Sequence, residues 1–266
     1  MSIGGTERLA REPLPTDMSR GHVHFVGIGG IGLSAIARIL LAWGAKVSGS
    51  DLHLSPVTDD LAALGMQVFE GHRAENIAGA TLLVMSSAVP EDNVEVMAAR
   101  AQGIPVLKRA DILGQMMAGK FGIAVAGTHG KTTTTAMIAH LLVEAGWDPT
   151  VIVGGIVGNW GSNARSGSGE HFVIEADEYD HMFLGLGPRI AVVTHLELDH
   201  PDCFPTMADM MAEFRRFLAL VPAEGQIVAC AACHVTWEDL AEVKSLAVEE
   251  SHQRRGLGSR LLSACL

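Results

Sequence analysis

The chain has 266 residues, of which 48% are hydrophobic and 18% are charged, and its formal net charge at pH 7 is -11. This length allows one large domain or two ordinary ones, and the composition is typical of a soluble globular protein. The acidic balance argues against a nucleic-acid partner, because proteins that bind polyanions present a basic face. The net charge does not exclude a small nucleotide as ligand, since backbone N–H groups, one lysine and a metal ion are enough to hold phosphates.

The segment 1–20 is polar and contains two prolines, so we expect a loose N-terminal tail. It lacks the apolar core of a signal peptide, and no apolar run is long enough to span a membrane. We therefore expect a cytoplasmic protein without a membrane span. Among the four cysteines, Cys230 and Cys233 precede His234 in the pattern of a c-type haem attachment site. Without an export signal, we do not interpret this pattern as a haem or redox site.

From residue 22 to residue 107, short apolar runs alternate with amphipathic stretches, which is typical of a parallel sheet with helices on its faces. The predicted strands are His22–Val26, Lys46–Gly49, Gln67–Phe69, Leu82–Ser86 and Ile104–Leu107. The predicted helices are Ile31–Trp43, Val57–Leu64 and Asn93–Gln102. We predict a Rossmann-like α/β domain over 21–119, which ends in a helix and hinge over Ala110–Lys120.

A second α/β series follows, and we place it over 120–230. Its predicted strands are Phe121–Ala126, Thr150–Val153, His171–Glu175, Ile190–Thr194 and Gln226–Cys230, and its predicted helices are Thr132–Ala145 and Ala208–Leu220. Asn159–Gly169 is rich in Gly and Ser and is predicted to be a loop. A strand, a glycine-rich turn and a helix at the start of this series indicate a domain of the phosphate-loop type.

The first glycine cluster fits the pattern G-x-G-x-x-G and comprises Gly27, Gly29, Gly30 and Gly32. It follows a predicted strand and opens a helix, and Asp51 ends the next strand, where a ribose-binding carboxylate is expected. Such a turn seats a pyrophosphate on the helix N-terminus. Alternatively, the glycines only permit close packing of strand and helix. The pattern specifies a diphosphate better than it specifies the nucleotide, so NAD remains one candidate.

The second glycine cluster is more specific, and it comprises Gly127, Thr128, His129, Gly130, Lys131, Thr132, Thr133 and Thr134. It follows an apolar strand and opens a helix, as a phosphate-binding loop requires. Backbone N–H groups would wrap the β-phosphate, Lys131 would add a charge near the β and γ oxygens, and the Thr132 hydroxyl would ligate Mg²⁺. Val125 stands where the common G-x-x-x-x-G-K-[ST] pattern has its first glycine.

This departure is informative, because G-T-x-G-K-T-T is the form found in Mur ligases and folylpolyglutamate synthases. The sequence resembles the Mur ligase family from about His22 to Cys230, and most closely the members that join L-alanine to UDP-N-acetylmuramate. Further segments that carry the resemblance are Ser48–Asp51, Gly71–Arg73, Ser86–Ala88, Glu175–Glu178 and Asp199–His200. One departure is His195, where the family usually has Asn beside the nucleotide.

The resemblance implies ATP and Mg²⁺, with UDP-N-acetylmuramate and L-alanine as substrates in peptidoglycan precursor synthesis. The muramyl carboxylate would attack the γ-phosphate to give an acyl phosphate, and the amine of L-alanine would then displace phosphate. The family's catalytic positions correspond to Lys131, Glu175 and His200, and its Mg²⁺ positions to Thr132, Glu175 and His200. Its UDP-sugar site corresponds to Gly27, Gly29, Gly30, Gly32, Asp51, His72 and Ser86.

Each assignment has a plainer alternative. Glu175–Asp180 is also readable as a solvated acidic loop, and Asp199 as a helix cap. A single His or Ser at a strand edge, such as His72 or Ser86, is often structural.

The last part of the chain, 231–266, differs from the family, whose members continue with further domains. Glu242–Val248 is predicted to be a strand, and a helix is predicted to run from residue 253 through Leu262. The turn before it has the form Q-x-x-G-x-G and resembles the pyrophosphate motif of acetyl-CoA-dependent N-acetyltransferases; the matching positions are Gln253, Arg254, Gly256 and Gly258. An ordinary amphipathic tail helix is the alternative. We expect a truncated or chimeric reading frame, joined near Ala229–Cys233.

Four hypotheses follow from these motifs. The chain is an ATP-dependent amide-bond-forming ligase, complete or impaired, or a non-catalytic remnant that binds nucleotide or UDP-sugar. A nicotinamide-dependent oxidoreductase would leave Gly127–Thr134 unexplained, and about forty residues are too few for the fold of an N-acetyltransferase. The retained site residues do not distinguish the first two hypotheses.

Overall fold

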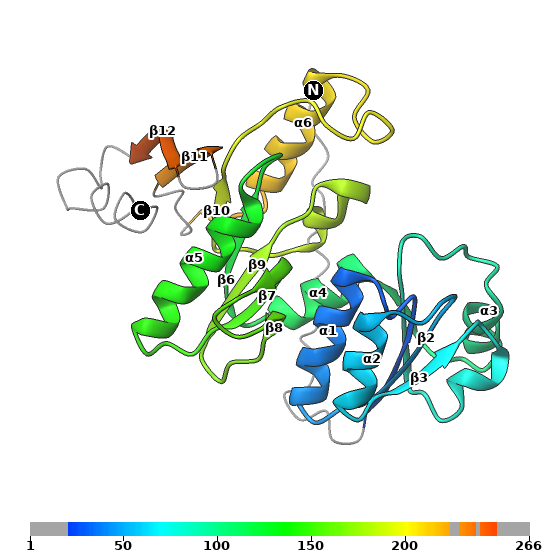
Figure 1. Ribbon diagram of the computed structural model, residues 1–266. Coiled ribbons are helices and arrows are strands. Elements are labelled where there is room, and N and C mark those ends of the chain that lie inside the picture. The colour runs from blue at the N-terminus through cyan, green and yellow to red at the C-terminus, as the bar shows by residue number, and fades with distance from the viewer. Residues whose placement is uncertain (1–20, 224–228, 238–239, 249–266) are drawn as a thin grey trace.

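The computed structural model describes residues 21–223 in full and the backbone of residues 229–237 and 240–248. Within these ranges the chain forms two consecutive α/β units and a hairpin (Figure 1). The tail predicted over 1–20 lies outside the described residues. No helix in the described part of the chain is long and apolar enough to cross a membrane.

The first unit is a five-stranded parallel sheet in the order β3-β2-β1-β4-β5. Its strands are β1 (His22–Val26), β2 (Lys46–Asp51), β3 (Gln67–Glu70), β4 (Leu82–Met85) and β5 (Val106–Lys108). Its helices are α1 (Ile31–Ala42), α2 (Pro56–Ala63), the 3₁₀ helix η1 (Ala74–Ile77), α3 (Val94–Ala101) and α4 (Arg109–Met117). The order reverses between β1 and β4, which confirms the Rossmann-like arrangement.

Local sequence explains where the helices of this unit begin. Ser55 caps α2 through a hydrogen bond from the Thr58 N–H, and Pro56 occupies the first helical position. Asn93 caps α3 by accepting from the N–H groups of Glu95 and Val96. All five residues of β1 are buried, as expected for the central strand of a sheet that is covered on both faces.

The second unit contains a five-stranded sheet in the order β10-β6-β9-β7-β8, in which only the β7–β8 pair is antiparallel. The strands are β6 (Phe121–Ala126), β7 (Thr150–Val157), β8 (Ser162–Arg165), β9 (His171–Glu175) and β10 (Ile190–Val193). The helices are α5 (Lys131–Glu144), the 3₁₀ segment η2 (Tyr179–Gly185) and α6 (Met207–Leu218). The predicted α/β order is confirmed.

One prediction in this unit is wrong. The segment predicted to be a loop, Asn159–Gly169, contains β8, and β7 continues to Val157 rather than ending at Val153. The glycines of this hairpin lower its strand propensity. The strand forms because Asn163 is buried against α1, a tertiary contact that local pattern does not reveal.

The two units share a hydrophobic core. One cluster of buried side chains runs from Val23 and Phe25 of β1 to Phe214 and Phe217 of α6. Phe183 stacks on Phe217 with ring centroids 4.7 Å apart. Figure 1 shows α1 and α4 at the junction, where α1 contacts β7 and β8 and α4 contacts η2. The two sheets are therefore packed together rather than joined by a free linker.

Beyond residue 228, β11 (Ala229–Trp237) and β12 (Leu240–Val248) form an antiparallel pair. The strand predicted at Glu242–Val248 is confirmed within β12. Of the strand predicted at Gln226–Cys230, only the last two residues are described, and they open β11. The proposed domain limit after residue 230 falls inside β11.

Candidate active site

The first glycine cluster forms the turn between β1 and α1. Gly27 has φ +85°, and the N–H groups of Gly27 and Ile28 bond to Ser50 O at 2.8 and 3.0 Å. The Gly29 N–H donates to Asp51 Oδ2 at 2.9 Å, and a Cβ on Gly29 would lie 2.9 Å from the same oxygen. The residue before α1 is Gly30, which has no side chain to cap the helix. The positive end of α1 is therefore open to an anion.

The residues predicted to bind a UDP-sugar gather at one edge of this sheet, and they are Gly27, Gly29, Gly30, Gly32, Asp51, His72 and Ser86. Asp51 ends β2, His72 follows β3 by two residues, and Ser86 directly follows β4. Gly32 lies beside Arg109, and a Cβ there would lie 2.5 Å from a terminal nitrogen of that side chain, which would have to move.

The second glycine cluster forms the turn between β6 and α5. Gly127 has φ +130°, and a Cβ there would lie 2.3 Å from Thr194 Oγ1 and 2.9 Å from His195 O. Gly130 precedes α5 with φ +80°. Both positions require glycine, because a side chain would be strained or would clash. The loop opens a helix of 14 residues with its N-terminal N–H groups free of a side-chain cap.

The turn after β10 forms a wall beside this loop. The Thr128 N–H donates to His195 O at 2.7 Å, and Thr194 Oγ1 donates to His129 O at 2.5 Å. The His195 side chain stacks on His129, with ring centroids 6.0 Å apart. His195 stands where the family usually has Asn. Its backbone carbonyl holds the loop through Thr128, and its imidazole ring packs on the ring of His129.

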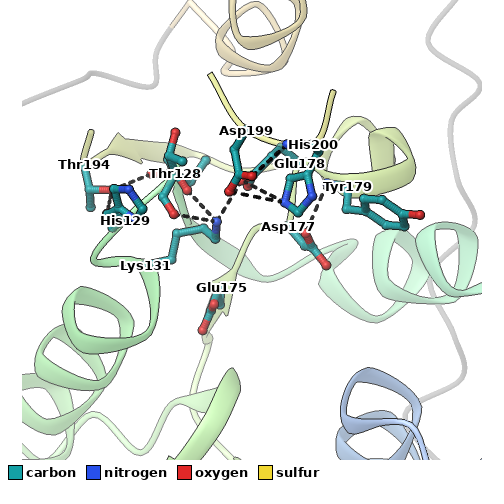
Figure 2. A network of polar contacts seen from close by, with 12 residues as sticks. Thr128, His129, Lys131, Glu175, Asp177, Glu178, Tyr179, Thr194, Asp199 and His200 are labelled. Carbon is teal, nitrogen blue, oxygen red and sulfur yellow. Dashed lines mark hydrogen bonds and ion pairs between the residues drawn. The ribbon is translucent and has the colours of Figure 1, made fainter. Parts of the chain in front are cut away.

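Lys131 points to a carboxylate that was not among the predicted site residues. Its Nζ lies 2.9 Å from Glu178 Oε1 and donates to Gly127 O at 2.6 Å (Figure 2). The Glu178 side chain is fully buried, and its second oxygen has no partner among the described residues. Paired charges and backbone carbonyls thus hold the lysine at the loop. The sequence signals for Glu178 are its place in the acidic run after Glu175 and in the segment Glu175–Glu178, which carries the family resemblance.

Thr132 and Glu175 also lie together. Thr132 Oγ1 donates to Glu175 Oε1 at 3.1 Å, and Glu175 Oε2 accepts from the Gly154 N–H at 2.6 Å. A hydroxyl beside a carboxylate at the start of α5 is a suitable pair of hard oxygen ligands for Mg²⁺. These two predicted metal positions therefore fit the ion that the family implies.

His200, the third predicted metal position, is grouped with other residues. Its Nε2 lies 4.0 Å from Glu178 Oε1 and 3.8 Å from Asp199 Oδ2, and Figure 2 shows Glu175 apart from this cluster. The His200 ring meets the Tyr179 ring edge-on, with centroids 5.2 Å apart. The negative charge of Asp202 and its hydrogen bond with the Tyr179 hydroxyl raise the pKa of Tyr179. Within residues 21–223, no three His, Cys, Asp or Glu side chains form a group that could hold a metal ion.

Two polar contacts link the two units across the junction. Arg109, at the start of α4, pairs with Asp177 at 2.8 Å, and Asp177 is adjacent to Glu178. Asn163 of β8 donates to Ile31 O, in the first turn of α1, at 2.7 Å. Neither Arg109 nor Asn163 was predicted, because their partners are distant in sequence. The acetyl-CoA-like positions Gln253, Arg254, Gly256 and Gly258 lie outside the described residues.

Each of the two glycine turns joins the carboxyl end of a strand to the helix that follows it, which is the arrangement of nucleotide-binding α/β proteins. Residues 22–121 match the model of the Mur ligase family, catalytic domain, and residues 125–254 match that of the Mur ligase middle domain. The chain belongs to the Mur ligase family.

The similar curated proteins include two UDP-N-acetylmuramate--L-alanine ligases. The protein of Solibacter usitatus is 54% identical over 210 residues, which are 79% of this chain and 44% of that protein. The protein of Ruegeria pomeroyi is 48% identical over 233 residues, which are 88% of this chain and 48% of that protein. The chain thus spans about half the length of the curated relatives it matches.

Solved structures show the same fold. The UDP-N-acetylmuramate:L-alanyl-gamma-D-glutamyl-meso-diaminopimelate ligase from Neisseria meningitides superposes with a TM-score of 0.74 at 30% identity, over 84% of this chain and 83% of that chain. The UDP-N-acetylmuramate-alanine ligase from Thermotoga maritima gives a TM-score of 0.67 at 31% identity, over 79% of this chain and 54% of that chain.

Proposed function

We propose that the chain carries the two nucleotide sites of an ATP-dependent ligase of peptidoglycan precursor synthesis, which joins L-alanine to UDP-N-acetylmuramate. The observation that carries the proposal is the loop at the start of α5, where Lys131 bonds to Gly127 O and the next residue, Thr132, bonds to Glu175. The identity to the two curated L-alanine ligases favours these substrates over others.

In this proposal the ATP phosphates lie on the N–H groups at the start of α5. Lys131 is 15% exposed and is already aimed at the loop, so it reaches the β and γ oxygens by exchanging Glu178 for phosphate. Thr132 and Glu175 would hold Mg²⁺, which neutralises phosphate charge when bound. His200 lies next to Glu178, the partner of Lys131, and would face the transferring phosphoryl group.

UDP-N-acetylmuramate would lie with its diphosphate on the open N-terminus of α1. A carboxylate oxygen of the muramyl group attacks the γ-phosphorus, the bond to the β,γ-bridging oxygen breaks, and ADP leaves. The amine of L-alanine then attacks the acyl carbon, loses a proton, and expels inorganic phosphate to leave the amide. Such phosphoryl transfer depends on positioning and charge stabilisation, which the loop and Lys131 supply.

The test is ADP formation by the whole chain with ATP, Mg²⁺, UDP-N-acetylmuramate and L-alanine. We expect one ADP for each amide formed, no ADP without UDP-N-acetylmuramate, and at most one ADP per protein chain without L-alanine, because the acyl phosphate forms before the amine attacks. The alternative function, which the sequence leaves open, is nucleotide binding without turnover. Binding of ATP and UDP-N-acetylmuramate without ADP release would support that alternative. ADP release that ignores both acceptor substrates would contradict the ligase.

A further inference from the structure

A buried polar cluster lies behind the first glycine turn and takes no part in the proposed chemistry. Its centre is Glu95 of α3, whose side chain is fully buried. Glu95 Oε1 accepts from Asn76 Nδ2 at 2.6 Å and from the Arg73 N–H at 3.1 Å. Oε2 accepts from the Ser50 hydroxyl at 2.5 Å. These three donors satisfy the buried carboxylate and fix its orientation.

Glu95 is ionised at neutral pH. Burial alone would raise its pKa, but hydrogen bonds from His24, Ser50, Asn76 and the Arg73 N–H outweigh burial and lower the pKa below the ordinary value of 4.5. Two imidazole rings also face Oε2, with His24 Nε2 and His72 Nδ1 each at 3.5 Å. The carboxylate therefore acts only as an acceptor toward Ser50 and His72.

The hydrogen bonds then fix the tautomer of His72. Ser50 Oγ lies 2.9 Å from His72 Nδ1, and the single hydroxyl hydrogen of Ser50 is already donated to Glu95. The hydrogen between Ser50 and His72 must therefore come from the ring, so Nδ1 carries it. In the neutral ring Nε2 is left as a bare acceptor. No group in residues 21–223 bonds to Nε2, and the His72 side chain is 14% exposed.

His72 stands beside the ribose end of the predicted ligand site. It follows β3, next to β2, and the Gly71 N–H bonds to Asp51 O at 2.7 Å. Asp51 in turn separates His72 from the turn that would hold the diphosphate. Nε2 is an acceptor, so its partner must be a hydrogen-bond donor. The nucleoside half of the ligand carries such donors, whereas an ionised phosphate oxygen is itself an acceptor.

We propose that Glu95 is a positioning residue that acts through Ser50 to fix His72 as the Nδ1–H tautomer, so that Nε2 accepts a hydrogen bond from the nucleoside half of the UDP-sugar. The donor is a ribose hydroxyl or the imide N–H of the uracil ring. The inference rests on the proposed function, because it needs UDP at the first glycine turn.

The wild-type chain tests the tautomer and the donor. We expect ¹⁵N NMR at about pH 8 to show His72 protonated at Nδ1 and bare at Nε2, with His72→Gln used to assign the signal. We expect calorimetry to show that one of 2′-deoxy-UDP, 3′-deoxy-UDP and N3-methyl-UDP binds about tenfold more weakly than UDP to the wild type but not to His72→Gln, which identifies the donor to His72. An Nε2–H ring, or equal affinity for all four ligands, would overturn the proposal.

Glu95→Gln tests the positioning role. The two donors at Oε1 hold the amide oxygen there, so the new NH₂ group faces Ser50 and donates to it. The Ser50 hydroxyl must then donate to His72 Nδ1, which makes Nε2 a donor. We expect the His72 signal to switch to the Nε2–H form, the affinity for UDP to fall about tenfold, and the preference for UDP over the weak analogue to disappear.

The matched control is Asn93→Ala, which removes the cap of the same helix and leaves the Glu95 carboxylate in place. A merely structural role of Glu95 would make both variants lose affinity alike and keep the preference for UDP, and this result would overturn the inference. If Glu95→Gln does not fold, the wild-type tautomer and analogue series still decide. Absence of any UDP binding by the wild type would instead contradict the proposed function itself.

Discussion

Gly127 lies where the turn after β10 comes closest to the phosphate loop. The space that a side chain would need is filled by Thr194 Oγ1 and by the backbone of His195, and φ is +130°. This glycine therefore lets the loop and the wall beside it meet, which brings Thr128 and His129 into hydrogen-bond range of that wall. The backbone approach, rather than any side chain, sets the shape of the loop.

We expect Gly127→Ala to lower the free energy of unfolding by at least about 2 kcal/mol, because overpacking and backbone strain add. It should also weaken ATP binding. The matched control is Gly158→Ala, since a Cβ on Gly158 would meet nothing within 4 Å. Chemical denaturation of both variants measures the difference. Equal stability of the two would contradict this account of the loop.

Sequence alone could locate Lys131, Thr132 and Glu175, because a phosphate loop and strand ends are local patterns that predict where side chains emerge. Glu178 and Glu95 were missed for a physical reason. Each is a buried carboxylate whose partners come from other elements, and only the fold brings these partners together. His200 was predicted as a site residue, but its grouping with Glu178 rather than with Glu175 depends on the path of the turn after β10.

Among the elements, α1 and β8 form one of the links between the two units. The Asn163 side chain is 3% exposed, donates to Ile31 O, and lies 3.4 Å from Ser34 Oγ. The contact fixes the first turn of α1, on which the diphosphate is proposed to rest. The order of strands and helices was predictable from hydrophobic period and turn residues. β8 was not, because its stability comes from this long-range contact.

We expect Asn163→Ala to lower the free energy of unfolding by about 1–3 kcal/mol, since a buried donor to the Ile31 carbonyl is lost. The affinity for UDP should fall as well, because the turn is less fixed. Asn159→Ala is the control, as Asn159 is exposed in the same hairpin. Thermal unfolding and UDP titration of both variants give the comparison. An unchanged melting temperature for Asn163→Ala would show that the units do not depend on this contact.

At the scale of the whole molecule, buried charge makes stability depend on pH. The folded protein holds the pKa of Glu95 below its ordinary value of 4.5. The contribution of ionised Glu95 to the free energy of unfolding is therefore complete above about pH 4.5, and it is lost as the pH falls through the pKa of Glu95 in the folded protein. The two units and the family were within reach of sequence reasoning, whereas the core that the units share was not, because it joins side chains that are distant in sequence. The limits 21–119, 120–230 and 231–266 remain our proposed domain boundaries.

We expect Glu95→Gln to be less stable than the wild type by about 1–3 kcal/mol at pH 7, because hydrogen bonds to a charged acceptor are weakened. The gap should shrink as the pH falls below about 4.5, where the wild type loses its own contribution. Urea denaturation of both proteins across this range measures the gap. A gap of constant size from neutral to acidic pH would show that ionised Glu95 does not stabilise the fold.

The claim on which the account depends is that the loop from Gly127 to Thr134 binds the phosphates of ATP through Lys131. The direct measurement is calorimetric titration of ATP with Mg²⁺ into the wild type, Lys131→Ala and the exposed control Lys46→Ala. We predict that Lys131→Ala weakens ATP binding about 10- to 100-fold while Lys46→Ala leaves it unchanged. Equal ATP affinity in all three proteins would contradict the assignment of the phosphate loop.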